Sequence, residues 1–234
     1  TVNNGGSVWI DSGGGANNAT VNSGGTMTVY GFASDTDIVG GTQTIISGSA
    51  ESVNILSSGR QYVSFGQVRY TTIYSGGRQI ISSDGFADDI LIKAAGRLLV
   101  TDFGKAKNVI VSSNGQAYVL TLAEMQAITV QTGGGLWVGM AGFAENINIQ
   151  GAVHVATGGE GKNATIAPGG HLYLYGGAIL DGVINVRGTM MIDDSDQNGG
   201  FQLRGDIAQD TRGAHPGTAV SAMNATINLI VDGA

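Results

Sequence analysis

The chain contains no cysteine, so it forms neither disulfide bonds nor thiolate metal sites. It has only two prolines and 12% charged residues, with a formal net charge of −7. A nucleic-acid-binding protein needs a basic face to neutralise phosphates, so this charge balance argues against nucleic acid as a partner. No secretory signal pattern and no apolar run of transmembrane length is present. The sequence starts in the middle of a repeat, which we interpret as a segment of a longer protein.

Glycine is abundant, at 40 of 234 residues, and it recurs with a period of 16 to 19 residues. Each unit has a turn ending in Gly, followed by four strand-like residues that end in an aliphatic, as in Gly25-Thr26-Met27-Thr28-Val29. The repeating glycines are Gly6, Gly25, Gly41, Gly59, Gly77, Gly96, Gly115, Gly134, Gly151, Gly170 and Gly188. A period this short and regular predicts a solenoid in which each coil buries its apolar face on its neighbours.

Three apolar positions recur in each unit and are expected to face inward. A β-branched residue stands four before most of the glycines, as at Val21 and Ile73, and Ile147 and Ile184 are assigned to the same column. An aliphatic stands four after every glycine, from Ile10 to Ile192. Because strand side chains alternate between faces, the position two after the glycine should also point inward. That position begins with Val8, and its polar exceptions are Gln43, Gln61 and Gln79.

This pattern predicts an all-β fold, a right-handed parallel β-helix of about eleven or more coils. Helical repeats need roughly 34 to 47 residues per unit and would not tolerate this much glycine. We expect regular repeats over residues 1–192. Residues 193–234 are expected to form irregular coils or a loop with a partial repeat, continuing the same domain.

The units Thr20-Val21-Asn22-Ser23-Gly24-Gly25-Thr26 and Thr72-Ile73-Tyr74-Ser75-Gly76-Gly77 resemble the passenger repeats of self-associating autotransporter adhesins. That family includes the diffuse-adherence adhesin, antigen 43 and TibA, and the repeats are most similar to a TibA-like passenger. The resemblance covers residues 1 to about 192. It implies a virulence-associated passenger that reaches the bacterial surface through the periplasm, is anchored in the outer membrane, and mediates autoaggregation, biofilm formation and host-cell adhesion.

The resemblance also implies partners and modification sites. The expected partners are a second copy of the chain on another cell, a host-cell receptor or glycan, and a cytoplasmic heptosyltransferase that attaches heptose to repeat serines. No cofactor is implied. The matching turn serines are Ser23, Ser57, Ser58, Ser75, Ser112 and Ser113.

The position three after each glycine should face outward, and five of its residues are aromatic: Trp9, Tyr62, Tyr118, Trp137 and Tyr173. These rings either shield a sheet face or form a contact surface. Arg60, Arg78 and Arg97 fall at one position of successive coils, where like charges repel unless a partner compensates them. They are either solvated and stacked on neighbours, or they meet acids of another copy. The candidate acids are Asp35, Asp37, Glu51, Asp88 and Asp89.

An enzyme is not expected, although a β-helical polysaccharide lyase or hydrolase is the alternative, with a passive spacer as a third. Glycoside hydrolysis needs paired carboxylates on one face, and the acids here are scattered. Asp193, Asp194 and Asp196 could bind calcium, but an acidic loop is the simpler interpretation, so no metal site is expected. The motif Asn-Ala-Thr occurs at Asn18, Asn163 and Asn224, at the same phase of the repeat, which favours a structural role at the entry to a strand.

Overall fold

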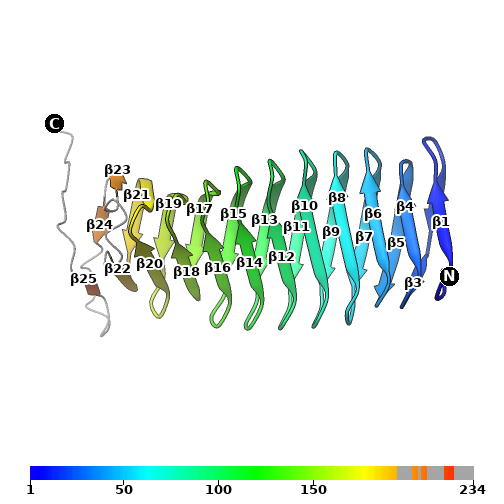
Figure 1. The fold of residues 1–234 in the computed structure, drawn as a ribbon. Coiled ribbons are helices and arrows are strands. Elements are labelled where there is room, and N and C mark those ends of the chain that lie inside the picture. The colour runs from blue at the N-terminus through cyan, green and yellow to red at the C-terminus, as the bar shows by residue number, and fades with distance from the viewer. Residues whose placement is uncertain (194–201, 205–206, 210–218, 224–234) are drawn as a thin grey trace.

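The computed structural model describes residues 1–193, 202–204, 207–209 and 219–223. These residues form β-strands and turns, and the strands stack in parallel as a solenoid of about ten turns (Figure 1). The predicted all-β solenoid is therefore confirmed. Most of the segment 193–234, expected to be irregular, lies outside the described residues, so that domain division stays a prediction.

Two parallel sheets run the length of the solenoid. The first sheet holds β25 (Ala219–Met223) and the strands that follow the repeating glycines: β1 (Ser7–Ile10), β4 (Thr26–Val29), β6 (Thr42–Ile46), β8 (Arg60–Ser64), β10 (Arg78–Ser82), β12 (Arg97–Val100), β14 (Gln116–Val119), β16 (Gly135–Val138), β18 (Ala152–Val155), β20 (His171–Tyr175) and β22 (Thr189–Asp193). The second sheet holds β2 (Gly15–Asn17), β3 (Thr20–Asn22), β5 (Phe32–Val39), β7 (Ser49–Ile55), β9 (Gln67–Ile73), β11 (Phe86–Ile92), β13 (Lys105–Val111), β15 (Glu124–Val130), β17 (Phe143–Ile149), β19 (Glu160–Ile166), β21 (Ile179–Val186), β23 (Gln202–Arg204) and β24 (Ile207–Gln209).

The predicted inward columns form the core between these sheets. Every aliphatic from Ile10 to Ile192 in the column four after the glycines is buried. Val8 is an exception to the prediction, since it lies in the first coil and is 37% exposed. The column before the glycines was assigned wrongly at two coils. Ile147 and Ile184 are buried, but strand register continues this column through Ile149 and Val186, because fewer residues separate these strands from the next repeating glycine.

The glycines that define the repeat are needed because the backbone of the preceding coil passes close by. A Cβ on Gly77 would lie 2.3 Å from the carbonyl oxygen of Ile55, which no side chain tolerates. Gly77 itself has no positive φ; in the turn before it, Gly76 takes that conformation instead, with φ 75°. Close approach, rather than backbone conformation, therefore explains the repeating glycine at this position.

Three glutamines form a buried ladder in successive coils. Gln43, Gln61 and Gln79 are fully buried, as their inward column predicts. The Nε2 of Gln79 donates to Oε1 of Gln61 at 2.7 Å, and the Nε2 of Gln61 donates to Oε1 of Gln43 at 2.8 Å. Gln43 in turn donates to the sulfur of Met27 at 3.5 Å. The inward amides are thus satisfied mostly by one another, which fixes how these coils stack.

A third corner divides each long strand of the second sheet, and the sequence pattern did not reveal it. One residue per coil takes a left-handed conformation there: Asn18, Asp35, Ser52, Tyr70, Asp89, Asn108, Ala127, Asn146, Asn163 and Gly182. We call these residues the corner column. Asn18 and Asn163, which begin two of the Asn-Ala-Thr motifs, both belong to it, with φ of 52° and 53°. Asparagine tolerates this conformation better than most residues, so the motif has a structural role, but at Asn163 this role lies at a corner inside β19 and not at the strand entry. Asn224 lies outside the described residues.

Candidate interaction surfaces

The predicted arginine column exists on the first sheet. Strand pairing sets Arg78 directly beside both Arg60 and Arg97. All three side chains are exposed, and within the described residues none of them forms an ion pair. Neighbouring strands lie about 4.8 Å apart, so three uncompensated positive charges follow one another along the solenoid.

The predicted outward aromatic column also exists on the first sheet. Trp9 is the most open of its rings, at 66% exposure, whereas Tyr62 and Tyr118 are half-buried. Toward the other end, the rings of Trp137 and His154 are nearly parallel, with centroids 4.0 Å apart. His154 stacks in the same way on Tyr173 at 4.6 Å. These rings cover one another's faces and shield the sheet, and Trp137 remains 37% exposed.

Two titratable groups at this stack, His154 and Tyr175, have shifted pKa values. Burial lowers the pKa of His154 below the ordinary value. Its Nδ1 lies 2.9 Å from the hydroxyl of Tyr175. Burial, followed by the charges of Tyr173 and Asp193, raises the pKa of that hydroxyl above its ordinary value. The stack therefore favours neutral imidazole next to protonated phenol.

The second sheet carries a column of alternating charges that sequence reasoning missed. Each residue immediately precedes the corner column or continues the same register, and each lies exposed or half-buried on the outer face. The column begins with the neutral residues Asn17 and Ser34, and the nine residues that follow in chain order are Glu51, Arg69, Asp88, Lys107, Gln126, Glu145, Lys162, Asp181 and Arg204. We call these nine residues the charge ladder. Eight of the nine are charged in a chain with only 12% charged residues, so charge is concentrated here.

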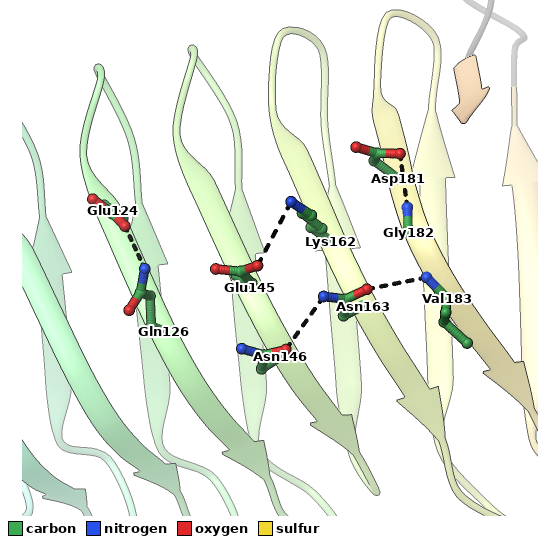
Figure 2. A network of polar contacts seen from close by, with 9 residues as sticks. All are labelled: Glu124, Gln126, Glu145, Asn146, Lys162, Asn163, Asp181, Gly182 and Val183. Carbon is green, nitrogen blue, oxygen red and sulfur yellow. Dashed lines mark hydrogen bonds and ion pairs between the residues drawn. The ribbon is translucent and has the colours of Figure 1, made fainter. Parts of the chain in front are cut away.

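Contacts within the charge ladder are local and partly satisfied. Nζ of Lys162 lies 3.8 Å from a carboxylate oxygen of Glu145 on the neighbouring strand (Figure 2). Asp88 accepts a hydrogen bond from the side chain of Asn108 at 2.9 Å. Asp181 accepts the backbone N–H of Gly182 at 2.7 Å. Opposite charges at neighbouring positions each stabilise the sheet by about 0.2–1 kcal/mol.

The corner column next to the ladder adds an amide network. The side chains of Asn146 and Asn163 lie on adjacent strands, and Nδ2 of Asn163 donates to Oδ1 of Asn146 at 3.4 Å (Figure 2). The Oδ1 of Asn163 accepts the backbone N–H of Val183 at 3.0 Å. The outer face of the second sheet is therefore a band of charges edged by amides.

The acids expected to meet the arginine column lie on this second sheet. Glu51 and Asp88 belong to the charge ladder and each has Arg69 as a register neighbour. Asp37 accepts a hydrogen bond from Asn54 at 2.9 Å. Asp35 and Asp89 are exposed members of the corner column. Three of the five acids thus have partners or opposite charges within their own chain.

The six candidate serines lie in or beside the turns that precede first-sheet strands. Ser23, Ser57, Ser58, Ser75 and Ser113 are exposed, and Ser112 is half-buried. These turns stack along the solenoid: the N–H of Ala95 donates to the carbonyl of Asn114, and the N–H of Asn114 donates to that of Gly133. A glycosyltransferase that modified serines in these stacked turns would therefore encounter a similar backbone conformation in each coil.

Two negative findings concern the described part of the chain. It contains no group of three or more side chains arranged to hold a metal ion. It also contains no helix suited to crossing a membrane. Of the acidic trio weighed as a calcium site, Asp194 and Asp196 lie outside the described residues.

The fold is similar to a solved structure, the crystal structure of a TibC-catalysed, hyper-glycosylated fragment of TibA covering residues 55–350. The two superpose with a TM-score of 0.70 and share 26% sequence identity. The similarity covers 94% of this chain and 88% of that chain. No family model and no curated protein matches the sequence. The chain therefore has a TibA-like passenger fold, in agreement with the resemblance of its repeats.

Proposed function

We propose that this chain is the passenger of a bacterial surface adhesin and that it binds a second copy of itself through the charge ladder. The likeness to TibA supports an adhesin-type solenoid displayed outside the cell. Self-association is supported by the order of charges along the charge ladder. This order is antisymmetric about Gln126, which means that charges at equal distances before and after Gln126 have opposite signs.

The antisymmetry arises because the regular alternation of positive and negative charges is interrupted at the neutral residue, Gln126. In strict alternation the two neighbours of any position have the same sign, but Gln126 has Lys107 on one side and Glu145 on the other. Every charge a given number of coils before Gln126 therefore has its opposite the same number of coils after it. The four pairs are Lys107 and Glu145, Asp88 and Lys162, Arg69 and Asp181, and Glu51 and Arg204.

Two copies facing each other with antiparallel axes would place these pairs in contact. A two-fold axis through Gln126 along the strand direction brings each coil of one copy against its counterpart on the other. The symmetry doubles the four pairs to eight opposite-charge contacts, with no like-charge contact within the ladder. A parallel arrangement in register would instead face each charge with its own sign. The antiparallel arrangement is also a closed dimer, as two-fold interfaces are.

The free energy of association is modest for one pair of molecules, but it becomes large when many pairs form between two cells. An exposed ion pair contributes about 0.2–1 kcal/mol, so eight pairs contribute several kcal/mol before the cost of association. Many passengers on facing surfaces would act together and raise the apparent affinity strongly. This fits the autoaggregation and biofilm formation that the family resemblance implies, and it predicts weakening by salt.

Sedimentation velocity over a concentration series tests the proposal. We expect a reversible dimer at about 50 mM salt that dissociates toward monomer at about 500 mM, where the screening length is short. A monomer at every concentration in low salt would contradict self-association and leave attachment to host cells or a spacer role. Charge reversal of Arg60, Arg78 and Arg97 should leave the dimer intact if the ladder is the interface. Loss of the dimer in that variant would instead assign it to the arginine column.

Serine glycosylation is a further part of the proposal. TibA carries sugars added by TibC, and the exposed turn serines here occupy stacked turns open to solvent. Co-expression with a heptosyltransferase followed by peptide mass spectrometry should place heptose on turn serines such as Ser75. Alanine at Ser75 should remove only that peptide's added mass. An unmodified protein under these conditions would argue against glycosylation by this class of enzyme.

A further inference from the structure

The two sheets differ sharply in charge. The first-sheet strands from β1 to β20 contain no Asp or Glu, although the chain has 18 acidic residues and a net charge of −7. The arginine column is the main charge on these strands. Lys93, in the turn before β12, adds a fourth cation and lies over the ring of Tyr74 at 4.3 Å. The strand face itself is therefore locally cationic and suited to an anionic partner, while the exposed Asp84 and Asp102 lie in the turns that follow β10 and β12.

The arginine column leads into a groove on the same face. The groove is lined by Arg97, Asn114, Gln116, Gly135, Trp137 and Ala152. The first position of each first-sheet strand carries Arg97, Gln116, Gly135 and Ala152 in turn, so side chains shorten just beyond the last arginine. The groove thus joins a cation, two amide side chains and an aromatic ring.

Gly135 is the residue that opens this groove, and the fold does not require glycine there. Its φ lies outside the left-handed region. A Cβ at this position would find no atom within 4 Å. Glycine within a strand costs roughly 0.5–1 kcal/mol relative to alanine and often marks a bulge, a bend, or a site where another backbone or a ligand approaches closely. Gly135 pairs in unbroken register with both neighbouring strands, so it marks no bulge. Since no backbone of this chain approaches, the free space is available to a ligand.

Trp137 supplies the apolar wall. One face of its ring is covered by His154. On the other side the strand neighbour is Tyr118, whose hydroxyl donates to Oε1 of Gln116 at 3.2 Å and whose ring does not stack on the indole within the described residues. The side chain is 37% exposed. A flat, partly open ring beside amide donors and acceptors is the usual arrangement for a sugar ring, whose C–H face stacks on the indole while its hydroxyls hydrogen-bond.

We propose that the arginine column and this groove together bind a linear polyuronate, a polysaccharide with a carboxylate on its sugar rings. The chain would run along the solenoid axis, with one sugar against Trp137 and its carboxylates on the guanidinium groups of Arg97, Arg78 and Arg60. Arginine binds carboxylate through paired N–H groups, which suits this role. The surface lies on the first sheet, so it is independent of self-association through the second.

Trp137 also provides the readout. The chain has two tryptophans, so a Trp9→Phe variant leaves Trp137 as the sole indole fluorophore. Titration with a short oligogalacturonide should change the emission of Trp137 with a saturating curve. The same oligosaccharide with its carboxylates methyl-esterified should bind at least about tenfold more weakly, because it keeps the rings and loses the charges. Added salt should weaken binding of the acidic form.

Two variants in this background separate the parts of the site. Arg97→Gln should weaken binding roughly tenfold through loss of one charge-assisted contact. Gly135→Val should block the groove while folding normally, since valine favours strands and its Cβ has space. Lys107→Glu, on the other sheet, is the matched control and should bind as the parent does.

Three results would overturn the proposal. The first is no fluorescence change with the acidic oligosaccharide up to millimolar concentration. The second is equal binding of the acidic and esterified forms, which would remove the role of the arginines. The third is unchanged binding by a folded Gly135→Val variant, with folding checked by its thermal melt, which would move the sugar out of the groove.

Discussion

Swapping the two charges that flank Gln126 distinguishes contacts between copies from contacts within one chain. In the antiparallel dimer, Lys107 of one copy meets Glu145 of the other. Lys107→Glu alone creates two like-charge contacts per dimer because the two-fold axis repeats it. Adding Glu145→Lys restores both contacts between copies. Within each chain, however, the double variant leaves a new glutamate beside Asp88 and a new lysine beside Lys162.

The expected sizes follow from the values for exposed ion pairs. Each reversed contact changes from about 0.5 kcal/mol of attraction to a similar repulsion, so two contacts cost about 2 kcal/mol. That weakens the dimer roughly thirtyfold. The double variant should recover most of this affinity while its thermal unfolding midpoint falls below that of the parent, because both in-chain neighbours are now alike.

Sedimentation equilibrium in low salt measures the dimer constants, and calorimetry measures the unfolding midpoints. Arg78→Glu makes the same kind of charge reversal on the first sheet and serves as the control, with an unchanged dimer constant expected. If the double variant stays as weak as Lys107→Glu, the two residues do not meet across an antiparallel interface. The reasoning from antisymmetry would then be wrong.

Three further predictions concern the scaffold. Gln61→Leu should destabilise the solenoid by about 1–3 kcal/mol in urea unfolding, because Oε1 of Gln43 loses its donor and Nε2 of Gln79 keeps only Oγ1 of Thr71 as an acceptor; a loss below about 0.5 kcal/mol would refute the glutamine ladder. Asn163→Ala should cost about 1–2 kcal/mol through the left-handed corner and the lost acceptor for Val183, whereas Asn163→Gly should cost clearly less than alanine. Because the pKa of His154 is lowered on folding, the unfolded chain binds its proton first, so stability should fall as the pH drops through the unfolded value; His154→Phe should flatten that part of the pH profile, and an unchanged slope would contradict the assignment.

The core residues could be predicted because they stand at a constant number of positions after each repeating glycine. The unbroken run from Ile10 to Ile192 reflects a strand of constant length after each turn. The offset failed at Ile147 and Ile184, because shorter turns there shift the counting while strand pairing continues unbroken. Predicting the alignment of residues by counting backward across a turn of variable length is therefore less reliable than counting forward along a strand.

The corner column and the charge ladder were not predictable in the same way. Asn, Asp, Ser, Tyr and Ala all occupy the corner, so no residue type marks it. The ladder steps from Glu51 to Arg69 and from Glu145 to Lys162 differ in length, and its last step, from Asp181 to Arg204, is longer still. The residue that follows each Gly-x-Ala motif, as Asp88 follows Gly85-Phe86-Ala87, would have aligned four members: Glu51, Asp88, Lys107 and Glu145. The full order needed the register between strands.

The orientation of two copies in the dimer tests the central claim most directly. Because the chain has no cysteine, a single cysteine can carry a spin label at one chosen corner residue. Ala127, next to Gln126, should give a short distance between the two labels of a dimer. Ser52, four coils away, should give a longer one, with the coils offset by about 38 Å along the axis from eight strand spacings. Equally short distances at both positions would mean a parallel dimer and would contradict the account.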